Sequence, residues 1–312
     1  MSEFGFIASI AESFASLPSN GFEGIGDDCA VLPVGNGESL LFTSDMLNEG
    51  VHFLRHAASP AEIGAKSLMV NLSDIAAMGG RPVATLLSIA LPADVGEDWV
   101  AEFMRGYRDV AERFGVALVG GDTTRSQSGV VVDVTAIGRA ADDCIKRRRD
   151  ARAGDVIMVG DLLGASAEGL RDILAGRLDT AVAAVHRNPQ AQICEGEWLG
   201  RQRCVHAMMD ISDGVASDLV HILRASAVGA VVETTHIPAY AELENAVCGG
   251  EDYKLLFTVA ADLADDLRLR FEKEFGYPIF PIGRITADNA GTISWLRSGE
   301  QIYPSWHGFT HF

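Results

Sequence analysis

The sequence has few cysteines and few lysines, and both shortages exclude classes of protein. Its five cysteines never approach a Cys-x-x-Cys spacing, so no disulfide framework is expected. Only four of the 25 basic residues are lysines, against 43 acidic residues, and the net charge is −18. An extended nucleic-acid surface needs clustered positive charge, so we expect no nucleic-acid partner. An anionic ligand would need metal cations to offset the charge of the protein.

Long apolar segments are also missing. The longest largely apolar stretch, residues 83–91, is far shorter than a membrane span. The N-terminus has acidic residues and apolar residues in helical spacing, in place of the basic region of a signal peptide. We therefore expect no membrane partner and a cytoplasmic protein whose cysteines stay reduced.

Several well-known catalytic motifs are absent. The sequence contains no G-x-x-x-x-G-K-[ST], no G-x-G-x-x-G, no G-x-S-x-G and no H-R-D-x-x-x-x-N. The main candidate ligands are therefore aspartates near the ends of predicted strands and helices. Hard oxygen ligands of this kind suit Mg²⁺, and several such ions can bridge the phosphates of a nucleotide.

Length and composition indicate an ordinary globular protein with two domains. The chain has 312 residues, of which 48% are hydrophobic and 22% are charged. A charged, turn-rich segment at 140–154 separates two halves. We predict the α+β class with two domains: an N-terminal mixed α/β domain, residues 1–142, and a C-terminal α+β domain, residues 143–312.

Hydrophobic periodicity and turn signals predict the elements of both halves. The predicted helices span residues 4–17, 60–78, 99–114, 167–174, 189–199 and 213–225. The predicted strands span residues 28–34, 39–45, 82–91, 116–120, 130–139, 156–159 and 254–259, with one ending at Met209 and one near Val231. The order of elements is not a regular βαβ alternation, so mixed sheets are expected.

Two aspartates flank a predicted hairpin. Asn36-Gly37 is a strong signal for a two-residue turn. If Gly35 faces Glu38, Asp28 lies opposite Asp45, with Cβ atoms roughly 4.5–5.5 Å apart. Like charges at that distance are destabilising unless a cation lies between them. The alternative is a pair of solvated turn aspartates.

The helix at 60–78 carries a polar stripe on an otherwise apolar surface. Ser67, Asn71 and Asp74 recur at helical spacing, and a helix this apolar is buried. The stripe must therefore face partners rather than bulk water. It is either a buried hydrogen-bond network or a set of ligands.

Three further segments combine acidic residues with glycines. Because glycine has no side chain, the backbone of such a segment can come close to a ligand. Gly120-Gly121-Asp122 follows a predicted strand and suits a phosphate or a simple turn. In Asp210-Ile211-Ser212-Asp213-Gly214, Ser212 is a natural helix N-cap, and the same helix N-terminus can hold a phosphate while its aspartates reach metals. Gly249-Gly250-Glu251-Asp252-Tyr253 is either a turn or the mouth of a site.

Together these segments resemble the thiamine-monophosphate kinase family, which belongs to the superfamily of aminoimidazole ribonucleotide synthetase. Each motif is only modestly specific, but the ordered set is highly specific. The matching motifs are Ile25-Gly26-Asp27-Asp28, Thr43-Ser44-Asp45 with the following residues 46–53, Asn71-Leu72-Ser73-Asp74, Gly120-Gly121-Asp122, Asp210-Ile211-Ser212-Asp213-Gly214 and Gly249-Gly250-Glu251-Asp252-Tyr253.

The resemblance implies direct, in-line transfer of a phosphoryl group from ATP to thiamine monophosphate with several Mg²⁺ ions, the last step of thiamine diphosphate biosynthesis. It implies a homodimer formed through N-terminal β-strands and no catalytic residue beyond the ligands. The implied metal ligands are Asp28, Thr43, Ser44, Asp45, Asp74, Asp122, Asp210 and Asp213. The implied ATP contacts are Gly121, Asp122, Arg149 and Ser212, and the implied substrate contacts are His52, Glu251 and Phe309.

Two points stay open from the sequence. The basic segment 147–149 departs from the pattern of the family, so any of its arginines can be the ATP contact. The protein can also be another ATP-dependent enzyme of the superfamily, or a non-catalytic protein that binds a nucleotide and Mg²⁺.

Overall fold

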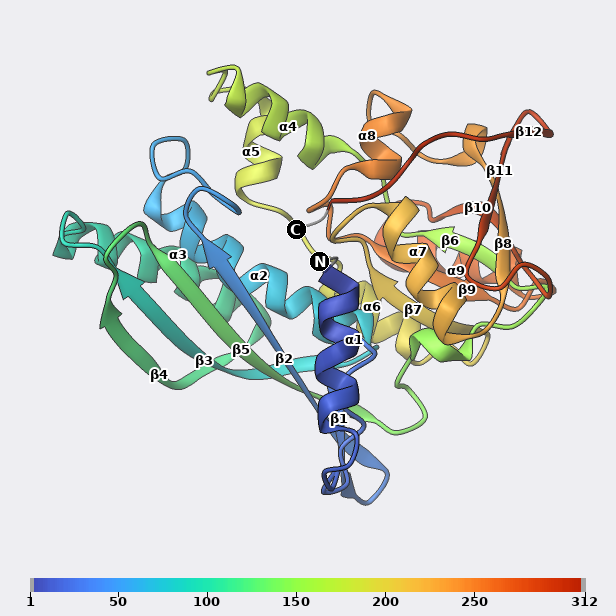
Figure 1. Cartoon of the computed structure of the whole chain (residues 1–312), viewed down its shortest axis with the longest axis horizontal. Coiled ribbons are helices and arrows are strands. Elements are labelled where there is room, and N and C mark those ends of the chain that lie inside the picture. The colour runs from blue at the N-terminus through green and yellow to red at the C-terminus, as the bar shows by residue number, and fades with distance from the viewer. Residues whose placement is uncertain (1–2, 310–312) are drawn as a thin grey trace.

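The structure is a computed structural model that describes residues 3–309, and the chain folds into two halves, each built on its own sheet (Figure 1). The predicted domain ends at 1–2 and 310–312 lie outside the described residues. The first half comprises α1 (Glu3–Phe14), β1 (Ala30–Gly35), β2 (Glu38–Asn48), α2 (Pro60–Ala77), β3 (Arg81–Leu91), α3 (Glu97–Phe114), β4 (Ala117–Arg125) and β5 (Val131–Ala141). Its five strands lie in the order β1-β2-β5-β3-β4.

The second half carries a seven-stranded sheet with helices on both faces. Its elements are a 3-10 turn (Arg148–Asp150), β6 (Val156–Val159), α4 (Ala165–Leu174), α5 (Ala181–Arg187), α6 (Ile193–Gly200), β7 (Val205–Asp210), α7 (Val215–Ala225), β8 (Gly229–Glu233), a 3-10 turn (Thr234–His236), α8 (Leu243–Cys248), β9 (Leu255–Val259), α9 (Ala264–Phe275), β10 (Phe280–Thr286), β11 (Ile293–Arg297) and β12 (Glu300–Ile302). The strand order is β12-β11-β8-β10-β6-β9-β7. The α+β class and the two-domain organisation are confirmed, whereas the boundary at 142/143 stays a prediction.

Helix α2 is the element that the two halves share. Ser59 caps it through a capping box with Glu62, so its start is determined locally. Most of its residues are buried, as the apolar surface predicts. One side packs with α3 beneath the first sheet, and the other side meets α6. A Cβ on Gly196 would lie 2.4 Å from the carbonyl oxygen of Ala76, so only glycine permits this approach of the two helices.

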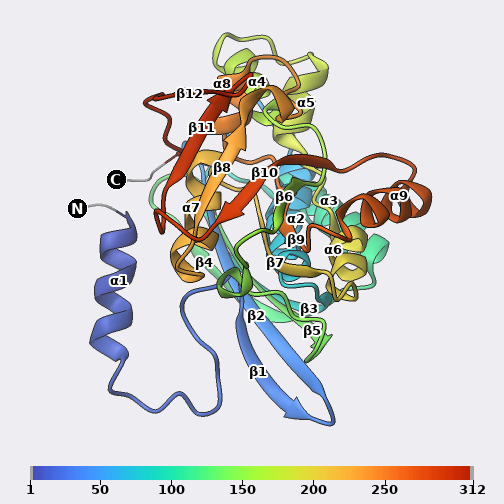
Figure 2. The same ribbon diagram turned by 90° about the vertical axis from the view of Figure 1, so that its right-hand side faces the viewer.

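The other face of the first sheet is open. Every residue of β4 is exposed, and so are Leu86 on the adjacent strand β3 and Met46 on β2 of the same sheet. Figure 2 shows that α1 stands apart from the body of the molecule. Its apolar residues Phe6 and Phe14 are exposed too. In this half, α2 and α3 are the helices that contribute side chains to the core beside the sheet.

Two sequence predictions about strands are wrong. Gly35 does pair with Glu38, but an irregularity next to Pro33 shifts the register, so Pro33 pairs with Ser39. Because β1 begins only at Ala30, Asp28 lies before the strand and does not pair with Asp45. The second error is the end of β4, which continues beyond residue 120 to Arg125, because the strand pairs with β3 along this whole stretch.

The other predicted elements occur within a few residues of their expected ends, but some elements were not expected. The helix predicted at 189–199 begins at Ile193, and α5 precedes it. Helices α8 and α9 and strands β10 to β12 were also missed. Within residues 3–309, no helix is both long enough and apolar enough to span a membrane.

Candidate active site

Three carboxylates from distant parts of the chain meet between the two halves, and they belong to one buried and two half-buried residues. Asp28 precedes β1, Asp74 lies in the last turns of α2, and Asp210 ends β7. Each offers a carboxylate oxygen, and these oxygens all lie within 4.8 Å of one another. We call these three residues the acid cluster. Such a spacing of hard oxygen donors is what a divalent cation needs.

Each carboxylate of the acid cluster accepts a side-chain hydrogen bond, and that of Asp28 accepts it at Oδ1 from Arg148. Thr43 Oγ1 donates to Asp74 Oδ2, and Ser73 Oγ donates to Asp210 Oδ2 at 2.5 Å. The other carboxylate oxygen of Asp28 is buried and has no hydrogen-bond partner among the described residues. A buried, unpaired carboxylate oxygen is costly, so this atom is a candidate ligand for a cation.

Burial and mutual repulsion raise the pKa values of two members of the acid cluster, Asp210 and Asp74. Burial, followed by the charge of Asp28, raises the pKa of Asp210 to about 7. Burial, together with the neighbouring charges of Asp45 and Asp210, raises the pKa of Asp74 well above its usual range. A divalent cation would remove this repulsion and would favour the ionised carboxylates.

A pocket of about 510 Å³ opens beside the acid cluster, and its walls come from both halves. Asp45 of β2 and Asp74 lie on the wall of the first half, and Ser212 and Asp213 lie on the wall of the second half. Burial, followed by the charge of Asp133, raises the pKa of Asp45 to about 6. One end of the pocket is therefore acidic.

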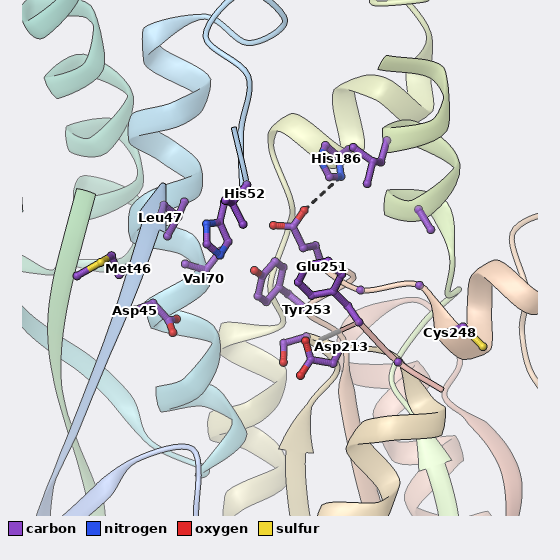
Figure 3. Close-up of a pocket in the computed structure, with 18 of the residues that line it drawn as sticks. Asp45, Met46, Leu47, His52, Val70, His186, Asp213, Cys248, Glu251 and Tyr253 are labelled. Atoms are coloured by element: carbon purple, nitrogen blue, oxygen red, sulfur yellow. Dashed lines mark ion pairs between the residues drawn. The ribbon is translucent and has the colours of Figure 1, made fainter. Parts of the chain in front are cut away.

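The opposite end of the pocket is lined by aromatic, imidazole and apolar side chains, and we call it the ring end. In Figure 3, His52 of the first half faces Glu251 and Tyr253 of the second half, while Asp45 and Asp213 lie lower in the view. Phe309 also lines the pocket, and its backbone N–H donates to the carbonyl oxygen of Asp213 at 3.1 Å. The pocket can therefore hold a molecule with a phosphate at one end and rings at the other.

The backbone conformation of the loop that carries Glu251 is constrained by close contacts. Glu251 has φ +64°, and its N–H donates to the carbonyl oxygen of Ser212 at 2.7 Å. A Cβ on Gly250 would lie 2.6 Å from that same oxygen. Gly250 is therefore needed for the close approach of this loop to the segment before α7, whereas a Cβ on Gly249 would lie 2.3 Å from the carbonyl oxygen of Asn245.

The predicted N-cap role of Ser212 is wrong. Helix α7 begins at Val215, and its N-cap is Gly214. The carboxylate of Asp218 accepts hydrogen bonds from the backbone N–H groups of Asp213 and Gly214 at 3.1 and 3.0 Å. A side chain from inside the helix satisfies these amides, and Ser212 and Asp213 line the pocket.

Four predicted site residues lie away from the pocket and the acid cluster. Ser44 is exposed, because side chains alternate along a strand and those of Thr43 and Asp45 take the inner face. Gly121 and Asp122 lie on the exposed edge strand β4 and line a different cavity of about 340 Å³. The fourth, Arg149, is described below.

Gly121 also has a structural reason to be glycine. A Cβ there would lie 1.7 Å from the carbonyl oxygen of Leu87 on the adjacent strand, and its φ is +148°. Strand β4 is separated from β2 by two intervening strands, a distance of about 14 Å at the usual spacing.

The arginines at 147–149 have different partners. Arg149, which is more than half exposed, and Arg147 both pair with Glu23, at 2.9 and 2.8 Å. Arg148 is the arginine that reaches the acid cluster, where its Nη2 donates to Asp28 Oδ1 at 2.5 Å. The geometry therefore favours Arg148 over Arg149 as the arginine of the site.

Lys66 is a residue of the site that the sequence predictions missed. It is buried in α2, and its ammonium pairs with Glu251 at 2.9 Å. The sequence did contain an indication that Lys66 is unusual, because it is one of only four lysines and lies in a nearly apolar helix. Its partner, however, is 185 residues away along the chain, and no periodicity indicates that contact.

Comparisons with known proteins cover nearly the whole chain. The models "AIR synthase related protein, N-terminal domain" and "AIR synthase related protein, C-terminal domain" match residues 26–140 and 152–296. A thiamine-monophosphate kinase of Haemophilus influenzae is 36% identical over 306 residues, which are 92% of this chain and 91% of that protein.

Two solved structures are similar as well. The structure of AaThiL complexed with AMPPCP and TMP has a TM-score of 0.84 and 30% identity, and the match covers 100% of this chain and 97% of that one. The crystal structure of thiamine-monophosphate kinase from Stenotrophomonas maltophilia has a TM-score of 0.77 and 35% identity, with 97% and 98% covered.

Proposed function

Because this chain belongs to the thiamine-monophosphate kinase family, we propose that it transfers the γ-phosphoryl group of ATP to thiamine monophosphate, with thiamine diphosphate and ADP as products. The observation that carries the proposal is the pocket of about 510 Å³ that has an acidic end and a ring end. A thiamine phosphate has the same division, with a phosphate ester on one side and two rings on the other.

We propose Mg²⁺ as the metal, bound by the acid cluster. Its three oxygen donors and the unpaired oxygen of Asp28 fit a hard divalent cation. The proposed ligands are Asp28, Thr43, Asp45, Asp74, Asp210 and Asp213. Bound Mg²⁺ supplies neutralisation of phosphate charge and alignment of the reacting groups. Ser44 and Asp122 stay predicted metal contacts that their positions in this chain do not support.

The proposed reaction needs no strong general base from the protein. The acceptor is a phosphate monoester with a second pKa of about 6, so its attacking oxygen is largely ionised at neutral pH. The difficulty is repulsion, because two unit charges about 4 Å apart cost about 4 kcal/mol at an effective dielectric of 20. The residues of the chain therefore bind and orient the two phosphates, and transfer is direct, without a covalent enzyme intermediate.

On the nucleotide side, we propose Arg148 and Ser212 as contacts in place of Arg149. Support comes from the position of Arg148 at Asp28 and from Ser212 in the pocket wall. With a cation bound at Asp28, the guanidinium of Arg148 would be available to bind a phosphate oxygen. On the acceptor side, we propose that His52, Glu251 and Phe309 contact the rings of the substrate, because all three line the pocket.

We also propose that the protein is a homodimer formed through the first sheet. Support comes from the exposed β4 strand and from the exposed apolar residues Met46, Leu86 and Val119. Gly121 and Asp122 lie far from the acid cluster of their own chain. In a dimer formed through this face, they could contact the nucleotide bound at the acid cluster of the second copy. The proposed compartment is the cytoplasm, which fits five cysteines that are all unpaired.

The test is incubation of the purified protein with ATP, Mg²⁺ and thiamine monophosphate, followed by separation of the thiamine phosphates. We expect thiamine diphosphate to accumulate in step with ADP, and Asp45→Asn to abolish its formation. Binding of ATP without any thiamine diphosphate would instead indicate a non-catalytic nucleotide-binding protein. Hydrolysis of ATP only with a different acceptor would indicate another enzyme of the superfamily.

A further inference from the structure

Lys66 is almost completely buried, with 2% of its surface exposed. A buried ammonium must be paired and fully hydrogen-bonded, because the loss of its hydration is costly. Its Nζ lies 2.9 Å from the carbonyl oxygen of His52, 2.9 Å from Glu251 Oε1 and 3.0 Å from Glu251 Oε2. The ammonium donates hydrogen bonds to the carbonyl oxygen of His52 and to Glu251 Oε2, and Oε1 adds an ion-pair contact.

The partners of Lys66 come from the two opposite walls of the pocket. His52 lies in the loop after β2 in the first half, and Glu251 lies in the loop before β9 in the second half. Both residues line the ring end, where they face each other in Figure 3. One ammonium therefore determines the separation between the two walls at this end of the pocket.

Glu251 keeps acceptor capacity for a ligand. An ionised carboxylate has about four lone-pair sites. Lys66 donates a hydrogen bond to Oε2, and His186 Nδ1 lies 3.3 Å from the same oxygen. Burial lowers the pKa of His186 to about 4, so this imidazole is neutral at neutral pH and leaves the Lys66 ammonium as the cation paired with Glu251. The remaining acceptor site of Glu251 can face the pocket that the residue lines.

We propose that Lys66 is the positioning residue of the ring end. It acts through two other residues, because it holds the Glu251 carboxylate where it accepts a hydrogen bond from the amino group of an aminopyrimidine, and it fixes the backbone at His52. This inference rests on the proposed function, because the aminopyrimidine is part of thiamine monophosphate. Lys66 is not among the residues that line the pocket, so its role is positioning rather than catalytic.

The test compares Lys66→Met, Glu251→Gln and the double variant with the unaltered protein. Lys146→Met is the matched control, because Lys146 is also buried, with 5% exposed, and its Nζ donates to the carbonyl oxygen of Gln202 at 3.0 Å, outside the pocket. For each variant, kcat and the KM values for ATP and for thiamine monophosphate are measured. The rise in melting temperature caused by each ligand is measured separately.

We expect Lys66→Met to raise the KM for thiamine monophosphate roughly 10-fold to 100-fold, since it misplaces a charged hydrogen-bond acceptor. The KM for ATP should stay within about two-fold, and Lys146→Met should change neither KM. The double variant should be no worse than Glu251→Gln alone, because Lys66 acts through that carboxylate. It also contains no uncompensated buried charge, so it keeps the test usable if Lys66→Met does not fold.

Three results would overturn the proposal. The first is an unchanged KM for thiamine monophosphate in folded Lys66→Met, and the second is an equal rise in the KM values for ATP and for thiamine monophosphate. The third is a double variant whose fold-increase in the KM for thiamine monophosphate equals the product of the increases in the two single variants. If Lys66→Met does not fold, the double variant decides. The proposal is then overturned if thiamine monophosphate raises the melting temperature of the double variant as much as it raises that of the unaltered protein. If the unaltered protein makes no thiamine diphosphate, the proposed function itself fails.

Discussion

The repulsion inside the acid cluster predicts that replacing one carboxylate makes the metal-free protein more stable. The carboxylate oxygens of Asp28, Asp74 and Asp210 lie within 4.8 Å of one another. At that separation and an effective dielectric of 20, each ionised pair repels by about 3.5 kcal/mol. Asp74 belongs to two such pairs. Arg148 and partial protonation relieve much of this repulsion, so we expect Asp74→Asn to raise the free energy of unfolding by about 1–3 kcal/mol without metal.

The assay is thermal unfolding at pH 8 in a chelator and again in excess Mg²⁺. In the chelator, Asp74→Asn should melt roughly 2–4 °C higher for each kcal/mol gained. In excess Mg²⁺ the unaltered protein should melt at the higher temperature. A Mg²⁺ concentration of 100 times Kd stabilises it by about 2.7 kcal/mol, whereas the variant has lost one metal ligand. Asp109→Asn on α3, whose side chain is 65% exposed, is the control and should change neither melt. A variant that melts lower in the chelator, or keeps the full Mg²⁺ response, would refute the repulsion argument.

Three further predictions concern the dimer, the pH dependence and the packing of α2. If the site needs both copies, an equal mixture of inactive Asp74→Asn and Asp122→Asn proteins should regain about a quarter of wild-type turnover after subunit exchange, and no recovery would contradict the shared site. Because burial lowers the pKa of His186 from 6.5 to about 4, its contribution to stability is present above pH 6.5 and is lost as the pH falls toward 4. The unfolding free energy of His186→Gln, compared with wild type over this range, should show up to about 3 kcal/mol less pH dependence, and parallel profiles would contradict the assignment. Gly64→Ala should destabilise the protein by about 1–3 kcal/mol in denaturant unfolding, because its Cβ would lie 2.1 Å from the carbonyl oxygen of Phe103, whereas Gly24→Ala meets no atom within 4 Å and should be neutral.

The elements near the site were largely predictable because their signals are local. Ser59 and Glu62 form the capping box that starts α2, and the apolar surface of that helix indicates burial. Asn36-Gly37 indicated the turn between β1 and β2. The ordered acidic motifs indicated a phosphate-transfer family, and the comparisons confirm that family. Each of these inferences uses residues a few positions apart.

The geometry of the site was decided by the tertiary structure. An irregularity next to Pro33 moved Asp28 off the register that would have placed it opposite Asp45. Asp28 meets Asp74 and Asp210 instead, because two separately formed sheets pack against α2. The choice of Arg148 over Arg149 likewise depends on which side chain a short turn directs toward Asp28.

Lys66 shows the same division most clearly. The sequence by itself placed a lysine within an apolar helix and thereby determined that its charge needs a buried partner. It did not determine which acid that partner is, because Glu251 is 185 residues away. Lys66 and Glu251 meet because the two halves pack together as a whole. The local structural propensities of the residues around either side chain do not predict this contact.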